Sequence, residues 1–171
     1  MKNIILLVSI FAVFLFVGCT DSSTATPKSS KARFQTVPAK QTTLIQKGKD
    51  KESCVICGMN LPTFYKTNHA AETKTGTKKQ YCSLHCVVHD NEINKTDLLN
   101  LKVVDTNSLK FIRADKAFYV VGSSKPGTMS RTSKYAFAKK SEAEAFSKKF
   151  GGKIMNFYDT YTVSMKDSFS K

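Results

Sequence analysis

The fold of this chain is decided by two sulfur-rich stretches, Cys54-Val55-Ile56-Cys57-Gly58-Met59 and Cys82-Ser83-Leu84-His85-Cys86-Val87-Val88-His89. Thiolate and thioether sulfur bind monovalent copper well, whereas magnesium and calcium prefer carboxylate and carbonyl oxygen. We therefore expect a site for a soft metal ion, with copper(I) as the first candidate and zinc as the alternative. Gly58 permits a left-handed backbone, so a tight turn can direct the Cys54 and Cys57 sulfurs toward one centre.

The second stretch adds ligands if it lies on a helix that begins near Cys82. Its two cysteines and two histidines then stand at positions i, i+3, i+4 and i+7, within about 100° of one helix face. A hairpin between the two stretches would bring the turn and the start of the helix together. We predict a metal site drawn from Cys54, Cys57, Met59, Cys82, His85, Cys86 and His89.

Two other interpretations of the role of the cysteines remain open. Treble-clef zinc sites have the same order of elements: a CxxC turn, a hairpin, and a CxxxC pair on a helix. In such sites four thiolates hold a purely structural metal. Met59 and the histidines favour copper, because a thioether is a poor zinc ligand and transfer sites keep two or three ligands in an open arrangement. Alternatively, export to an oxidising compartment would allow disulfides, and four cysteines permit three pairings.

An enzymatic reading of the CxxC pair is disfavoured. Redox CxxC motifs open a helix after a strand, where the helix terminus lowers the thiol pKa. Gly58 and Pro62 follow the pair here and argue against a long helix at that position. We therefore predict that the protein is not an enzyme.

Three residues have weaker claims as ligands. Met59 could instead fill a gap in the core, as methionine often does. His69 lies at the edge of the first hairpin strand, and Met129 lies in the loop Pro126-Gly127-Thr128-Met129. We keep His69 and Met129 as secondary metal candidates.

Residues 1–18 have the features of a signal peptide. Lys2 precedes an apolar run from Ile4 to Val17, which is too short and wrongly flanked to span a bilayer as a mature helix. Phe16-Val17-Gly18-Cys19 resembles a lipobox, so we expect cleavage before Cys19 and lipidation of that cysteine; a plain secretory signal is the alternative. We expect the mature protein to be lipid-anchored in the bacterial cell envelope, facing the periplasm or the outer surface.

Residues 19–50 are rich in Ser, Thr, Lys and Gln and contain few large apolar residues, so we predict a flexible tether. The formal net charge of the chain is +14, and loss of residues 1–18 removes only Lys2 from it. Such a charge attracts nucleic acid, anionic lipid or an acidic protein. An exported protein without a nucleic-acid motif seldom meets nucleic acid, so a membrane surface or a partner protein is expected instead.

The remaining sequence predicts an α+β fold built from two small ββαβ units, residues 51–107 and residues 108–171. In the first unit we expect a hairpin of residues 69–73 and 78–82, a helix over 84–91 and a strand over 101–105. In the second we expect strands at 117–121 and 135–138, a helix from Ser141 to Gly151 and a strand over 153–158. Ser141 and Glu144 form a capping-box pattern at the start of that helix.

Several motifs in order give the chain a resemblance to the NosL family of accessory lipoproteins. They are Cys57-Gly58-Met59, Tyr81-Cys82-Ser83, Val104-Asp105, Ala117-Phe118-Tyr119-Val120-Val121-Gly122-Ser123, Gly127-Thr128-Met129, and Ala145-Phe146 through Gly151-Gly152. The resemblance implies two ββαβ units like part of organomercurial lyase, the first treble-clef-like. It also implies an exported copper(I) chaperone that supplies nitrous-oxide reductase in denitrification, with that copper enzyme or its assembly proteins as partners. Cys57 and Met59 match the family's metal-binding motif.

Two departures from the family pattern stand out. Gly127-Thr128-Met129-Ser130 replaces the more usual Gly-Pro-Met-Gly, and the Cys82-x₃-Cys86 pair with its histidines exceeds what many members have. The additional ligands favour a second or zinc-like site. The alternative function is accordingly a lipoprotein module with structural zinc that mediates protein interaction.

Overall fold

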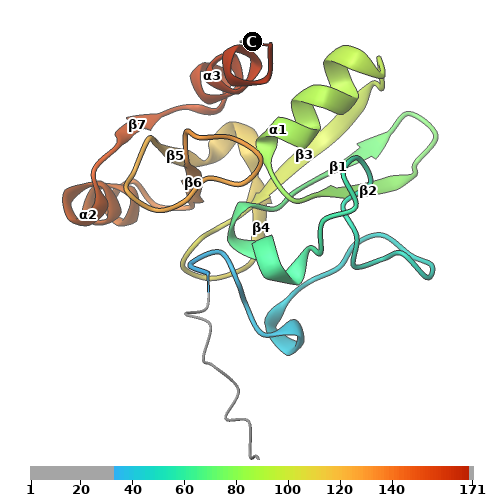
Figure 1. Ribbon diagram of the computed structural model, residues 1–171, viewed down its shortest axis with the longest axis horizontal. Coiled ribbons are helices and arrows are strands. Elements are labelled where there is room, and N and C mark those ends of the chain that lie inside the picture. Colours follow the sequence, from blue (N-terminus) through green and yellow to red (C-terminus); the bar gives the residue numbers. More distant parts are fainter. Residues whose placement is uncertain (1–32, 170–171) are drawn as a thin grey trace, which may run out of the picture. The chain divides into compact units, whose positions relative to one another are not determined.

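The computed structural model describes residues 33–169, in which two small antiparallel sheets are accompanied by three α-helices (Figure 1). The first sheet has the strand order β2-β1-β3-β4. Its strands are β1 (His69–Thr73), β2 (Lys78–Tyr81), β3 (Leu98–Val104) and β4 (Phe111–Arg113). The short helix α1 (Leu84–Val88) follows β2 and continues as one π-helical turn, His89–Ile93.

The second sheet has the order β6-β5-β7. Its strands are β5 (Phe118–Val121), β6 (Lys134–Phe137) and β7 (Lys153–Met155), with α2 (Lys140–Phe150) between β6 and β7 and α3 (Phe157–Phe169) after β7. Single 3₁₀ turns occur at Ala39–Gln41 and Ala114–Lys116, and a longer 3₁₀ segment at Pro62–Thr67.

The order β, β, α, β occurs twice along the chain, which confirms the predicted α+β class. Two elements were not expected. Strand β4 pairs with β3, so the first sheet includes residues beyond the predicted boundary at 107/108. Helix α3 occupies residues that were assigned in part to the last strand. The two sheets are linked through Asp105, which forms a parallel bridge with Ala136 and accepts the Ala138 N–H at 3.1 Å.

Apolar packing on each sheet explains why these elements form. In the second half, α2 buries Ala143 and Phe146, three residues apart, against Val120 and Phe137. In the first half, α1 contributes Leu84 and Val87 to a core that also contains Cys54, Cys82 and Cys86, with Cys57 packed against it. The metal candidates are therefore built into the main packing cluster of the first sheet.

The prediction for the end of helix α2 is confirmed, and the prediction for its start is wrong. Gly151, with φ of 73°, ends the helix as predicted, because glycine reaches this left-handed region without a side-chain clash. The capping box at Ser141 is wrong: the helix begins at Lys140, and its N-cap, Lys139, makes no side-chain cap hydrogen bond. Ser141 therefore lies inside the first turn of the helix.

The folded part begins earlier than the predicted boundary at residue 51. Phe34 packs against Tyr135, with ring centroids 5.2 Å apart. The Gln46 amide donates to the carbonyl of Ser53 at 2.6 Å and accepts from the Gln80 N–H at 3.0 Å. Residues 33–50 thus belong to the fold rather than to a tether, because their hydrogen bonds and aromatic contacts join them to distant strands.

The predicted signal peptide, Cys19 and the tether before residue 33 lie outside the described residues. Among residues 33–169, the structure contains no helix with the length and apolar character needed to cross a membrane.

Candidate metal centre

The first cysteine pair lies on a tight turn, as its sequence predicts. The Cys54 N–H donates to the Met59 carbonyl at 2.9 Å, and the Gly58 N–H donates to the Cys54 carbonyl at 2.9 Å. Gly58 has φ of 72°, the left-handed conformation that the turn requires. A further hydrogen bond, from the Val55 N–H to the Gln80 carbonyl at 3.3 Å, fixes the turn to strand β2.

The second cysteine pair comes from the end of β2 and the first turn of α1. Cys82 directly follows β2, and Cys86 lies in α1. The helix begins at Leu84 and Ser83 is extended, so the prediction that Cys82 belongs to one helical stripe with the other ligands is wrong. The Cys82 carbonyl lies 2.8 Å from the Thr67 hydroxyl, which holds the backbone at this strand-to-helix corner.

The four thiols nevertheless converge on one point. All four sulfur atoms lie within 4.8 Å of one another. The Cys57 and Cys82 sulfurs are 3.5 Å apart, and the Cys86 sulfur lies 3.7 Å from each of them. A tetrahedral ion with metal–sulfur bonds of about 2.3 Å requires sulfur–sulfur distances of about 3.8 Å. The thiols are therefore spaced for a shared metal ion, and all four cysteines are free of disulfides.

Burial differs among the four thiols. Cys82 and Cys86 are fully buried and Cys54 is 3% exposed, whereas Cys57 is partly exposed. An ion bound at this point would therefore be enclosed by three cysteines. Cys57 supplies the sulfur that lies closest to solvent.

The grouping of thiols also shapes their ionisation. The pKa of Cys54 lies far below its usual range, because the thiols of Cys82 and Cys86 stabilise its thiolate by hydrogen bonding. The pKa values of Cys82 and Cys86 are raised, first by their hydrogen bonds to Cys54 and also by burial. The metal-free site thus favours a single thiolate. Ionisation of further thiols places negative charges next to one another, and a bound cation is needed to offset their repulsion.

The histidines do not join the thiol group within residues 33–169. His69 is fully buried and separate from the thiols: its Nδ1 lies 3.0 Å from the Thr67 carbonyl and its Nε2 lies 3.3 Å from the Tyr119 hydroxyl. Burial lowers the pKa of His69 to about 4, so its ring is neutral near pH 7. These contacts give His69 a place in the core, and its assignment as a metal ligand is not supported by the geometry.

The two histidines that follow Cys82 are partly exposed on α1 and its continuation. His85 Nδ1 lies 2.9 Å from the Ser168 hydroxyl of α3, and burial lowers the pKa of this ring. His89 Nδ1 is buried and has no hydrogen-bond partner among the described residues. Both side chains therefore border the thiol group without belonging to it, and their role as ligands stays a prediction.

The two methionines occupy different positions. Met59 is partly buried and, like Cys57, packs against the core cluster that contains Cys54, Cys82 and Cys86. Met129 is 42% exposed and has φ of 58°, an uncommon conformation for a residue with a side chain. Its neighbour Thr128 lies 2.9 Å from the Thr67 hydroxyl, which also contacts Cys82, so the Met129 loop is fixed next to the cysteine corner.

Thr67 is a positioning residue that the sequence did not identify. Its hydroxyl touches both the Cys82 carbonyl and Thr128, 61 residues further along the chain. No local sequence pattern predicts such a contact, because it depends on how the two halves of the chain pack against each other. Gln80 is similar: its amide donates to the Asn68 side chain at 2.9 Å inside the core.

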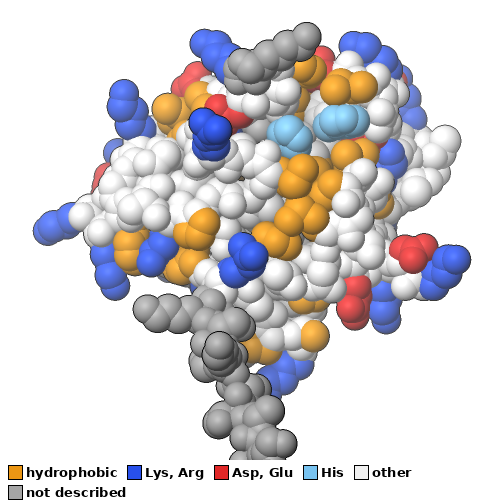
Figure 2. Space-filling model, viewed as in Figure 1, with side chains coloured by type: hydrophobic (Ala, Val, Ile, Leu, Met, Phe, Trp, Pro, Cys, Tyr) orange, Lys and Arg blue, Asp and Glu red, His pale blue; other side chains and the backbone are white. Residues whose placement is uncertain are grey.

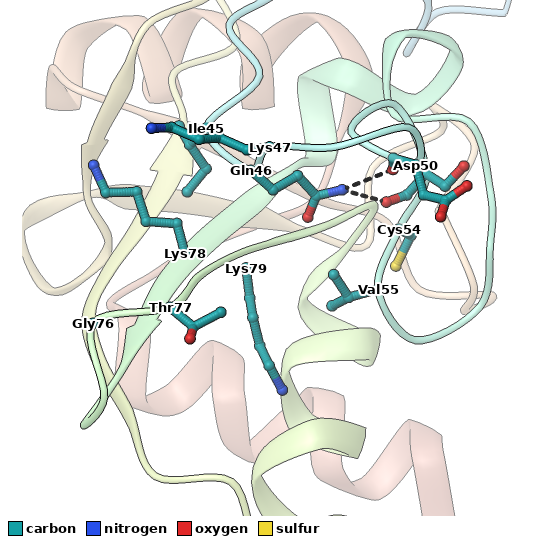
Figure 3. Close-up of a pocket in the computed structure, with 11 residues that line it drawn as sticks. Ile45, Gln46, Lys47, Asp50, Cys54, Val55, Gly76, Thr77, Lys78 and Lys79 are labelled. Atoms are coloured by element: carbon teal, nitrogen blue, oxygen red, sulfur yellow. Dashed lines mark hydrogen bonds between the residues drawn. The ribbon is translucent and has the colours of Figure 1, made fainter.

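An open groove of about 750 Å³ lies beside the first cysteine turn (Figure 3). Cys54 and Val55 form one side of it, and the β1–β2 turn with Lys78 and Lys79 forms the other. Lys47 and Asp50 also line it, and Lys79 forms an ion pair with Asp90 at 2.7 Å. Basic side chains thus prevail around a surface that approaches the metal candidates.

Comparison with known proteins places this geometry in a family. The crystal structure of the copper chaperone NosL from Shewanella denitrificans is similar, with 27% identity and a TM-score of 0.55 over 67% of this chain and 93% of that one. A comparison with curated proteins found no match. The family model for NosL matches residues 45–164, which include all four clustered cysteines. The chain therefore belongs to the NosL family.

Proposed function

We propose that this protein is a copper(I) metallochaperone of the cell envelope, which holds the ion at Cys54, Cys57, Cys82 and Cys86 and delivers it to a copper enzyme. The observation that carries the proposal is the convergence of four free thiols within 4.8 Å, with Cys57 partly open to solvent. The similar Shewanella denitrificans protein is a copper chaperone, which supports copper as the cargo. The protein is not an enzyme, since its family consists of chaperones.

Transfer would proceed by ligand exchange. A partner's sulfur or imidazole ligand would replace Cys57 first, because that thiol is the one accessible from solvent. The buried thiols would follow, so the ion is never released to water. Met59, which packs against the same cluster, is placed to assist as a soft thioether ligand.

The client that we propose is nitrous-oxide reductase or a similar copper enzyme, reached directly or through its assembly proteins. The groove beside Cys54 supports an acidic docking segment on such a partner, because Lys47 and Lys78 line it without an ion-pair partner among the described residues. Lys79 is already paired with Asp90, and Asp50 is the one carboxylate in the lining. Opposite charge at the rim of an interface raises the association rate.

Anchoring at Cys19 and a location in the periplasm or on the outer surface form part of this proposal. They rest on the apolar run of residues 4–17 and on the lipobox-like Phe16-Val17-Gly18-Cys19. Mass spectrometry of the protein purified from membranes would test them: an acylated N-terminal Cys19 is expected, and an unmodified mature N-terminus elsewhere would contradict them.

A structural zinc site is the second candidate. Three fully or almost fully buried thiols and a treble-clef-like arrangement of turn and helix start favour it, because closed four-thiolate centres are typical of structural zinc. In that case, removal of the metal would unfold the first sheet.

Competition between the two metals tests the proposal. The unit from Lys31 to Lys171, which is compact in its own right, would be reduced anaerobically and dialysed against copper(I) and zinc in buffers of matched free-ion concentration. One tightly bound copper(I) is expected, held about a hundredfold more weakly after Cys57→Ser. Retention of zinc in the presence of copper(I) would contradict the proposal.

A further inference from the structure

A cluster of lysines and aromatic rings gathers around Phe34, near the beginning of the described chain, and Phe150. Lys66 and Lys125 both lie over the Phe34 ring, with their Nζ atoms 4.3 Å and 5.0 Å from its centroid. Lys125 and Lys149 lie 4.1 Å and 5.2 Å from the Phe150 centroid. These five residues are named the basic-aromatic cluster.

The aromatic base of this cluster is held rigidly by the core. Phe34 and Phe150 are 6.2 Å apart between centroids, and each packs against Phe146 of α2, at 5.9 Å and 4.8 Å. Phe34 also meets Tyr135 of β6 edge-on. The lysines, which come from three separate segments of the chain, are therefore gathered over a fixed apolar platform.

The positive charge of the cluster has no carboxylate partner within residues 33–169. Six ion pairs occur in that part of the chain, and none of them involves Lys66, Lys125 or Lys149. The aromatic faces attract ammonium groups but do not neutralise them. Burial and the charge of Lys125 lower the pKa of Lys66, which indicates that the two charges are uncompensated. An anion bound between them would relieve this repulsion.

The surroundings of the cluster indicate a surface anion rather than an enclosed one. Lys66, Lys125 and both rings are only partly buried, and Lys149 is exposed. Figure 2 shows basic side chains among apolar ones next to the place where the described chain begins. Arg33 at that place lies 5.8 Å from the Phe64 ring, which adds a further cation. Apolar rings with lysine ammonium groups over their faces suit the boundary between lipid headgroups and acyl chains.

From this arrangement we infer that the basic-aromatic cluster binds the phosphate groups of an anionic lipid surface. Each lysine near an anionic bilayer strengthens binding about fivefold. The cluster includes Phe34, next to Arg33, so the face that we expect to meet the lipid lies at the start of the described residues. This inference does not depend on copper binding or on acylation of Cys19.

Sedimentation with vesicles tests it. The unit from Lys31 to Lys171 would be mixed with vesicles of phosphatidylcholine alone, or with vesicles that also contain about 30% phosphatidylglycerol and therefore have a strongly anionic surface. Binding to the anionic vesicles alone is expected. The double variant Lys66→Gln, Lys125→Gln should weaken it at least about tenfold, given two contributions of about fivefold each.

A matched control removes the same charge elsewhere. Lys95 and Lys102 are exposed and take no part in the aromatic contacts or ion pairs of the described residues, so Lys95→Gln, Lys102→Gln should change binding less than about threefold. Circular dichroism would confirm that both double variants are folded. Equal losses in the two double variants would overturn the inference in favour of net charge alone. Abolition of vesicle binding by inorganic phosphate at constant ionic strength would overturn it in favour of a free-phosphate site.

Discussion

Replacing one thiol at a time separates metal binding from packing, because the thiols differ in burial. Cys82 is fully buried next to the Thr67 contact, whereas Cys57 is partly exposed. Cys82→Ser places a hydroxyl in the core and should lower the free energy of unfolding of the metal-free protein by about 1–3 kcal/mol. Cys57→Ser should lower it by less than about 1 kcal/mol, since water can solvate the new hydroxyl.

Both changes should weaken metal binding to a similar extent. Structural four-ligand zinc sites gain about 10–16 kcal/mol from the metal, about 3 kcal/mol for each ligand, and we apply the same share to each thiolate here. Loss of one ligand should therefore reduce metal affinity about a hundredfold in each variant, because a factor of ten in affinity corresponds to about 1.4 kcal/mol. Only Cys82→Ser combines that loss with a less stable metal-free fold.

Urea unfolding of the reduced, metal-free variants and competition with a chelator of known copper(I) affinity measure the two effects. Cys57→Ser with full copper affinity would remove Cys57 from the ligand set. Equal destabilisation of the two metal-free variants would refute the argument from burial.

Three further predictions concern single residues. Met59→Leu should keep the fold and weaken copper(I) retention about tenfold in chelator competition; unchanged retention would mean that the thioether only packs. The unfolded chain, with a histidine pKa near 6.5, takes up protons before buried His69 does, whose pKa is about 4. The contribution of His69 to stability should therefore be constant above about pH 7 and fall by about 3 kcal/mol between about pH 6.5 and pH 4, measured as the difference in urea midpoint between the parent protein and His69→Asn; a His69→Asn variant with the same pH profile as the parent would contradict this. Gly152→Ala should cost more than about 2 kcal/mol, because φ is 95° and a Cβ would lie 2.8 Å from the Val121 carbonyl oxygen, whereas Gly151→Ala, with open space around it, should cost about 1 kcal/mol; equal melting temperatures would show that the clash is relieved.

Local patterns predicted the elements that depend on local chemistry. The β1–β2 hairpin follows from polar and small residues around Gly76, and the end of α2 follows from Gly151. The missed helix α3 had a signal of the same kind: the Asn156 side chain accepts the Asp159 N–H at 2.9 Å, as an N-cap does. The start of α2 was misplaced by one residue, because a capping box is only a preference and Lys139 takes that position without one.

Features that depend on contacts between distant residues could not be predicted from local sequence patterns. The segment around Phe34 and Gln46 has the composition of a tether, yet its few apolar and amide groups find partners about 35 to 100 residues away. The spacing of the four cysteines correctly indicated a shared centre, since CxxC and CxxxC bring sulfurs together over short loops. His69 could not be excluded from sequence, because its burial under Tyr119 arises only when the two sheets pack.

The central claim is that the four thiols hold a transferable ion on a fold that persists without it. Copper(I)-loaded protein titrated with a strong copper(I) chelator, while amide and aromatic NMR signals are recorded, tests this claim directly. The account predicts complete loss of copper with retained dispersion of signals from Tyr81 and Tyr119, and chemical-shift changes confined to residues near the four cysteines. Collapse of the Tyr81 signals as the metal leaves would contradict it, and would identify the site as structural.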